Sequence, residues 1–288
     1  MTTLNSSAGL KLDNILVATD LSAASKAALL YAIPIARRHE AKLSIVHVSS
    51  SESPANVLHA WRAAQTELMD YFMAGHLKGV RHELLVKSGD VWTVLSRLIA
   101  DYGIDLIVVG TRGRTGVAKF LLGSVAERIF RQAPCPVLTI GPSISGQDPE
   151  VGPQRILVPT GFAPHSLYAV GYALWLAQEL RSSSLALLHV VTDRPGAQDQ
   201  KRIRKERLER LHAVISTDET LPSRPECFVE FGSIPERILG TAARWNPNLI
   251  VLGLHHIDEA SRTETTWARA YEVVCKAGCP VLTVRAPV

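Results

Sequence analysis

The stretch Ile15-Leu-Val-Ala-Thr-Asp20 decides the fold, because it occurs a second time as Ile156-Leu-Val-Pro-Thr-Gly161. Both stretches are short and apolar at nearly every position, which is typical of a strand buried on both faces of a parallel sheet. Further blocks recur in the same order around them. The pairs are Ser25 with Ser166; Ala28, Ala32 and Ala36 with Ala169, Ala173 and Ala177; Ile45–Val48 with Leu187–Val190; Asp105–Gly110 with Asn248–Gly253; and Cys135–Ile140 with Cys279–Val284. Chance does not keep six blocks in order, so the chain is a duplicated domain.

A segment rich in Gly, Pro and Ser, Gly141–Pro153, separates the two copies and has the composition of a linker. We therefore expect one domain over residues 1–143 and a second over residues 153–288. Because apolar runs alternate with amphipathic stretches, each copy is predicted to be an α/β sandwich with five parallel strands and four helices, doubly wound.

The first amphipathic stretch is Ala23–Arg38. Four apolar residues recur along it at helical spacing, and we expect them to share the face that packs on the sheet. These residues are Ala27, Leu30, Tyr31 and Ile35.

Composition limits the class of protein. The chain has 288 residues, 47% of them hydrophobic, and a formal net charge of +4, which is too mild to indicate a nucleic-acid partner. No apolar run approaches the ~20 residues that span a bilayer, so no membrane partner is expected. Residues 1–11 lack the apolar core of a secretory signal, and the expected compartment is the cytoplasm.

The densest basic segment is Lys201–Arg210, in which acidic residues lie three and four positions from basic ones. This spacing favours a solvated helix face with ion pairs along it. Binding of an anionic partner is the alternative.

Other residues with chemical potential give weaker signals. Cys135, Cys227, Cys275 and Cys279 fit no zinc pattern and are predicted to be small buried apolar residues. His47 and His189 are expected to be packed and hydrogen-bonded within strands. A metal site at His255-His256 with Asp258 and Glu259 is the less favoured interpretation, because adjacent histidines in a loop rarely bind the same ion. The five tryptophans are expected in helices, in the core or at interfaces.

Two strand ends of the first copy carry residues suited to a phosphate-bearing ligand. One strand ends at Thr19-Asp20. Another is followed by a segment of the form G-x-x-G-x9-G-S, from Gly110 to Ser124. Glycines allow sharp turns and close approach of backbone amides to phosphate, and Gly123-Ser124 opens a helix whose N-terminus favours an anion. Arg112 adds positive charge, and Asp20 is placed to accept hydrogen bonds from ribose hydroxyls. Taken singly, each feature also fits a plain turn or helix cap.

These residues resemble those of the universal stress protein family over almost the whole chain, from Asp13 to Val284. The spacing of Gly110, Gly113, Gly123 and Ser124 matches the family's ATP-binding signature, and Val17–Asp20 and His47-Val48 match other family motifs. The resemblance implies a Rossmann-like, HUP-type fold with strand order 3-2-1-4-5. It also implies ATP, with Mg²⁺, held by the first copy. The implied site residues are Thr19, Asp20, Val48, Gly110, Arg112, Gly113, Gly123, Ser124 and Val125.

The second copy departs from this pattern. Gly161 replaces Asp20, His256 stands at the second glycine of the signature, and Thr265-Thr266-Trp267 stands where Gly-Ser is required. Asp258 and Glu259 add negative charge that repels phosphate. We therefore expect no ATP binding of the same kind in the second copy.

The leading functional hypothesis is an ATP-binding regulatory protein of the stress response rather than an enzyme. A slow ATPase or nucleotide-dependent transferase using the same pocket is one alternative, and a nucleotide-free interaction scaffold is another. The apolar strands that end each copy need pairing, so we expect either a homodimer or a pseudo-dimer within the chain.

Overall fold

The computed structural model describes residues 11–49, 54–73, 75–111, 122–141, 144, 149–180, 184–193, 195–215, 224–255 and 264–286. The chain forms two compact units, an N-terminal unit of Lys11–Gly152 and a C-terminal unit that contains Pro153–Val288. Within the described ranges, no helix combines the length and the apolar composition that a membrane span requires.

Each unit alternates strands with helices, as the repeat predicts. The N-terminal unit contains β1 (Asn14–Thr19), α1 (Ala23–Arg38), β2 (Lys42–Ser49), α2 (Pro54–Met73), β3 (His82–Ser88), α3 (Val91–Tyr102), β4 (Leu106–Gly110), α4 (Ser124–Gln132) and β5 (Val137–Ile140). The C-terminal unit contains β6 (Arg155–Pro159), α5 (Pro164–Leu180), β7 (Ser184–Val191), α6 (Ala197–Ile215), β8 (Glu226–Phe231), α7 (Ile234–Trp245), β9 (Leu249–Leu254), α8 (Glu264–Lys276) and β10 (Val281–Arg285).

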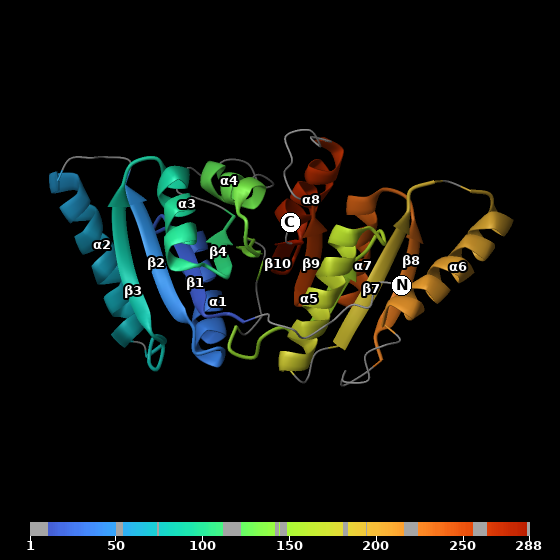
Figure 1. The fold of residues 1–288 in the computed structure, drawn as a ribbon, viewed down its shortest axis with the longest axis horizontal. Coiled ribbons are helices and arrows are strands. Elements are labelled where there is room, and N and C mark those ends of the chain that lie inside the picture. The colour runs from blue at the N-terminus through green and yellow to red at the C-terminus, as the bar shows by residue number, and fades with distance from the viewer. Residues whose placement is uncertain are drawn as a thin grey trace. The chain divides into compact units, whose positions relative to one another are not determined.

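The strands of each unit form a parallel sheet with the same order (Figure 1). In the N-terminal unit β1 lies between β2 and β4, with β3 and β5 outside them. In the C-terminal unit β6 lies between β7 and β9, with β8 and β10 outside them. Both orders are 3-2-1-4-5 when the strands are counted within the unit, which confirms the predicted fold class. The winding reverses between the first and fourth strands, so a crevice is expected at their carboxyl ends.

The first helix of each unit lies very close to the fourth strand. A Cβ atom added to Gly110 would lie 2.4 Å from the carbonyl oxygen of Ala24, and one added to Gly253 would lie 2.2 Å from that of His165. Because real Cβ atoms do not approach a backbone oxygen so closely, only glycine fits at these two strand positions. The repeated glycine is therefore explained by packing in both units.

The predicted packing face of α1 was wrong. Ala27, Leu30, Tyr31 and Ile35 are only partly buried, whereas the buried positions are Ser25, Ala28, Leu29, Ala32, Ile33 and Ala36. The buried face combines small residues, Ser25, Ala28, Ala32 and Ala36, with the larger Leu29 and Ile33. The matching alanines of α5, Ala169, Ala173 and Ala177, are fully buried as well.

Two further details differ from the expectations. Gly110 pairs with Ile140 as a strand residue, so its glycine is required by packing rather than by a sharp turn. The predicted linker also extends too far, because Gly152 closes the N-terminal unit and Glu150 forms an ion pair with Arg37 at 2.7 Å.

Gly110→Ala is expected to lower the free energy of unfolding by about 1–3 kcal/mol, because the added Cβ displaces the N-terminal turn of α1. Gly161→Ala is the matched control, since a Cβ there meets nothing within 4 Å. Urea denaturation followed by tryptophan fluorescence measures both. Equal midpoints for the two variants would contradict the packing explanation.

Candidate functional site

A cavity of about 260 Å³ lies at the carboxyl ends of β1, β2 and β4 in the N-terminal unit. Its wall is completed by the first turns of α3 and α4. The cavity therefore occupies the point where the winding of the sheet reverses, which is the usual ligand position in open α/β sheets.

Seven of the nine predicted site residues line this cavity, although they come from four separate parts of the chain. These are Thr19, Asp20, Val48, Gly110, Gly123, Ser124 and Val125. Arg112 and Gly113 lie outside the described residues. The structure thus brings the described members of the predicted set to one place, and their role in binding stays a prediction.

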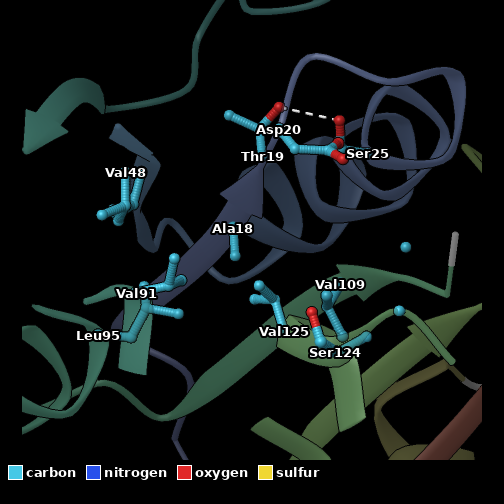
Figure 2. A pocket seen from close by; sticks show the side chains of 14 residues that line it. Ala18, Thr19, Asp20, Ser25, Val48, Val91, Leu95, Val109, Ser124 and Val125 are labelled. Carbon is cyan, nitrogen blue, oxygen red and sulfur yellow. Dashed lines mark hydrogen bonds between the residues drawn. The ribbon is translucent and has the colours of Figure 1, made fainter. Parts of the chain in front are cut away.

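The lining also includes residues that the sequence reasoning missed. Val91 and Leu95 of α3 lie with Val48 on one side of the cavity, while Thr19, Asp20 and Ser25 lie on another and Ser124 on a third (Figure 2). Val46, Val109, Ala18 and Ala126 complete the wall. Ser25 was visible in the sequence as a repeated residue, but nothing marked Val91 or Leu95. The cavity is consequently apolar at Val48, Val91 and Leu95, polar at Thr19, Asp20 and Ser25, and mixed around Ser124.

The N-terminus of α4 opens onto the cavity. Gly123 is the N-cap residue and accepts a hydrogen bond from the N–H of Glu127, at 2.9 Å, but it has no side chain with which to cap the helix. Within the described ranges, the N–H groups of Ser124, Val125 and Ala126 have no acceptor. Such a helix end carries partial positive charge and three free donors, which suits an anion.

A network of short hydrogen bonds shapes the turn after β1. The hydroxyl of Thr19 donates to Ser25 at 2.9 Å, and the N–H of Ser22 donates to the carboxylate of Asp20 at 3.1 Å. The Nδ1 atom of His47 lies 2.9 Å from the carbonyl oxygen of Thr19, which confirms the predicted hydrogen-bonded role of this histidine. Leu21 adopts a left-handed conformation, with φ of 63°. Together these bonds hold Asp20 at the rim of the cavity.

The C-terminal unit keeps this framework. Thr160 donates to Ser166 at 3.2 Å, and the Nδ1 atom of His189 lies 2.8 Å from the carbonyl oxygen of Thr160. Phe162 repeats the left-handed conformation of Leu21, also with φ of 63°. Because the second copy has lost the glycine signature, these shared features belong to the fold. Asp20, Gly123 and Ser124 have no such counterpart, and they distinguish the N-terminal site.

The equivalent edge of the C-terminal unit is filled by ring contacts. Phe162 is buried, and its ring centroid lies 4.6 Å from that of His189. The guanidinium carbon of Arg210, on α6, lies 4.2 Å from the same phenyl ring. The position of Leu21, next to the cavity residue Asp20, is therefore taken in the C-terminal unit by an aromatic ring that an arginine covers.

A histidine pair marks the other end of this edge. His165, at the start of α5, and His255, directly after β9, have ring centroids 3.6 Å apart. Burial lowers the pKa of His165 to about 4, and the positive charge of His255 contributes further to the shift. In the sequence, His255 follows Gly253 by two positions, as Arg112 follows Gly110, so His255 stands at the position of Arg112.

The described residues hold no group of three or more metal-ligating side chains. Of the residues in the less favoured metal-site prediction, His256, Asp258 and Glu259 lie outside the described ranges.

The cysteines are buried to different degrees. Cys279 is buried and Cys135, Cys227 and Cys275 are half-buried. Burial raises the pKa of Cys279 to about 12, which makes its thiol unreactive at neutral pH.

The match to known families covers both units. A model of the universal stress protein family matches residues 11–141 and again residues 153–285. The chain belongs to the universal stress protein family. Its two matched segments correspond to the two units, which makes it a tandem member.

Single-domain relatives of the family match one unit. A protein of Staphylococcus haemolyticus that carries the universal stress protein name is 35% identical over 139 residues, which are 44% of this chain and 83% of that protein. A relative from Staphylococcus aureus strain USA300 is also 35% identical over 139 residues, 44% of this chain and 82% of its own length.

Solved structures of similar length share the fold. A universal stress protein from Archaeoglobus fulgidus superposes with a TM-score of 0.71 at 20% identity, covering 95% of this chain and 98% of that one. A structure from Pseudomonas aeruginosa UCBPP-PA14 gives 0.62 at 18% identity, covering 95% and 93%. At these identities the likeness establishes the architecture of this universal stress protein and nothing about its ligand.

The pH dependence of stability is expected to contain a contribution from His165. Its pKa of about 4 in the folded unit lies below the unfolded value of 6.5, so the unfolded chain binds more protons between these pH values. This contribution is complete above pH 6.5 and is lost as the pH falls towards 4. His165→Gln should flatten the dependence in urea denaturation over this range, whereas His59→Gln, at an exposed position of α2, should not. Parallel curves for wild type and His165→Gln would refute the assignment.

Proposed function

We propose that the N-terminal unit binds ATP and that the protein acts as a nucleotide-dependent regulatory protein of the stress response. The observation that carries the proposal is one cavity with an apolar side, a carboxylate at its rim and an uncapped helix N-terminus. These three surfaces suit the three parts of a nucleotide. Membership of the universal stress protein family supports the same conclusion.

The base and the ribose are assigned first. Val48, Val91 and Leu95 form the apolar side, which suits the faces of an adenine ring. Asp20 lies at the rim, where its carboxylate can accept hydrogen bonds from ribose hydroxyls. The cavity, at about 260 Å³, lies just below the ~300–1,000 Å³ typical of ligand pockets, so it is suited to enclosing the nucleoside part.

The phosphates are assigned to the start of α4. The N–H groups of Ser124, Val125 and Ala126 lie at the end of the helix and can donate hydrogen bonds to phosphate oxygens. The hydroxyl of Ser124 is a further donor. Mg²⁺ commonly binds through phosphates, waters and one or two carboxylates. Since the described residues form no metal-ligand cluster, the nucleotide itself supplies the main ligands for Mg²⁺.

Binding is proposed in preference to catalysis. Among the residues that line the cavity, Asp20 is the one carboxylate, and the ribose occupies it in this assignment. The described lining therefore offers no separate general base for hydrolysis or transfer. The C-terminal unit is assigned no ATP. Gly161 stands at the place of the ribose acceptor Asp20, and the buried ring of Phe162 lies next to it.

Asp20→Ala is expected to weaken ATP binding by about 10- to 100-fold, because a charged acceptor of the ribose hydroxyls is lost. Isothermal titration calorimetry with Mg·ATP measures the change. Asp101→Ala, at an exposed position of α3, removes the same charge away from the cavity and should leave the affinity unchanged. Equal affinity of Asp20→Ala and wild type would remove Asp20 from the site.

The purified full-length protein is expected to bind one ATP per chain. The measurement is anion-exchange chromatography of the nucleotide released by denaturation, after incubation with Mg·ATP and removal of the excess. Two nucleotides per chain would contradict the assignment of the C-terminal unit. No retained nucleotide, together with no heat of binding, would favour the scaffold alternative, and steady release of ADP would favour the ATPase.

A further inference from the structure

The charges of α6 are divided between two sides of the helix. On the outer side, Arg202 pairs with Asp199 at 3.3 Å and with Glu206 at 2.9 Å, and Lys205 lies 3.9 Å from Glu209. These pairs confirm the predicted solvated face. They also engage every acidic residue between positions 197 and 215.

Three further arginines lie on α6, of which Arg204 and Arg210 are exposed and Arg207 is half-buried. Arg204 donates to the carbonyl oxygen of Val229 and lies over the ring of Phe231, and Arg210 lies over Phe162. Arg207, between them, is half-buried, and its Nε atom is out of contact with solvent and has no acceptor in the described part of the chain. Figure 1 shows α6 beside β8, the strand that Arg204 contacts.

No carboxylate in the described part of the chain forms an ion pair with these three arginines. Within the described ranges, none lies within 4.0 Å of the guanidinium groups of Arg204, Arg207 or Arg210. The acids of β8 are engaged elsewhere, because Glu230 pairs with Arg244 and Glu226 accepts a hydrogen bond from the indole of Trp245 at 2.8 Å. Grouped arginines with a buried donor lacking an acceptor are a common feature of anion sites.

His189 gives the site its chemical selectivity. Its Nδ1 atom faces the carbonyl oxygen of Thr160 and therefore carries the proton, which leaves Nε2 on the far edge of the ring as an acceptor. Burial lowers the pKa of His189, the hydrogen bond with Thr160 opposes this shift, and the charges of Arg207 and Arg210 lower the pKa further, which favours the neutral ring. His189 and Arg210 both contact the ring of Phe162. A neutral imidazole in this position can accept a hydrogen bond from a protonated oxygen of a ligand whose other oxygens are charged.

We propose that the C-terminal unit binds a small phosphate-class anion between Arg207, Arg210 and His189, at the edge where the N-terminal unit has its cavity. The guanidinium groups donate to the charged phosphate oxygens, and the protonated phosphate oxygen donates to Nε2 of His189. Sulfate has the same size and charge but carries no proton at neutral pH. The site is therefore expected to prefer phosphate to sulfate. The two units of this chain would then respond to different ligands.

The test is a titration of full-length protein with inorganic phosphate and with sodium sulfate at constant ionic strength and pH 7. Binding is followed by NMR of the histidine side chains, and the His189 signal is assigned with His189→Gln. We expect a saturable shift of the His189 signal, with phosphate binding at least tenfold more tightly than sulfate. A parallel titration with glycerol phosphate tells whether the ligand is a phosphate ester or free phosphate. If glycerol phosphate binds more tightly than inorganic phosphate, the ligand is an ester; if it binds more weakly, the ligand is free phosphate.

A pair of double variants on the same helix provides the control. Arg207→Gln with Arg210→Gln should weaken phosphate binding at least tenfold, while Arg202→Gln with Lys205→Gln removes the same charge from the outer side and should leave it unchanged. Arg207→Gln alone, as a milder variant, should show a smaller loss. Equal affinity for sulfate, equal losses in the two double variants, or no movement of the His189 signal would each overturn the proposal.

Discussion

The approach of the first helix to the fourth strand constrains the rest of each unit. At Gly110 and at Gly253 the strand meets a backbone carbonyl so closely that a methyl group has no space. This contact brings the start of the helix beside the end of the strand. Those two places border the crevice at the reversal of the winding. The geometry that packs the unit therefore also makes the candidate site.

The two copies act as internal controls for one another. Features kept in both, such as the hydroxyl pair Thr19–Ser25 and the histidine bond of His47, have counterparts in a unit that lacks the glycine signature. They are explained by the turn that they hold. Asp20 is present in one copy only, since Gly161 stands at its place in the other, so the turn after the first strand does not require it. A role in ligand binding is our proposal for this residue.

The C-terminal unit differs by addition as well as by loss. It has no equivalent of Asp20, but it gains a buried Phe162 and arginines that reach the sheet from α6. In a simple loss of function, mutations would leave the site open or fill it with apolar residues. Among these arginines, the Nε atom of Arg207 is a buried donor without an acceptor in the described part of the chain, which is costly for the fold. This atom is one physical reason for proposing that the unit has a ligand of its own.

The sequence by itself determined the duplication, the parallel α/β class, the strand order implied by the family resemblance, and the polar residues at the strand ends. These follow from local patterns, since buried strands are apolar throughout and glycines mark close approach or turns. Only the tertiary structure decided which face of α1 is buried, why Gly110 is glycine, and that Val91 and Leu95 line the cavity. It also separated the paired from the unpaired charges of α6. Each of these depends on distances between segments far apart in the chain, and helical or strand periodicity contains no information about them.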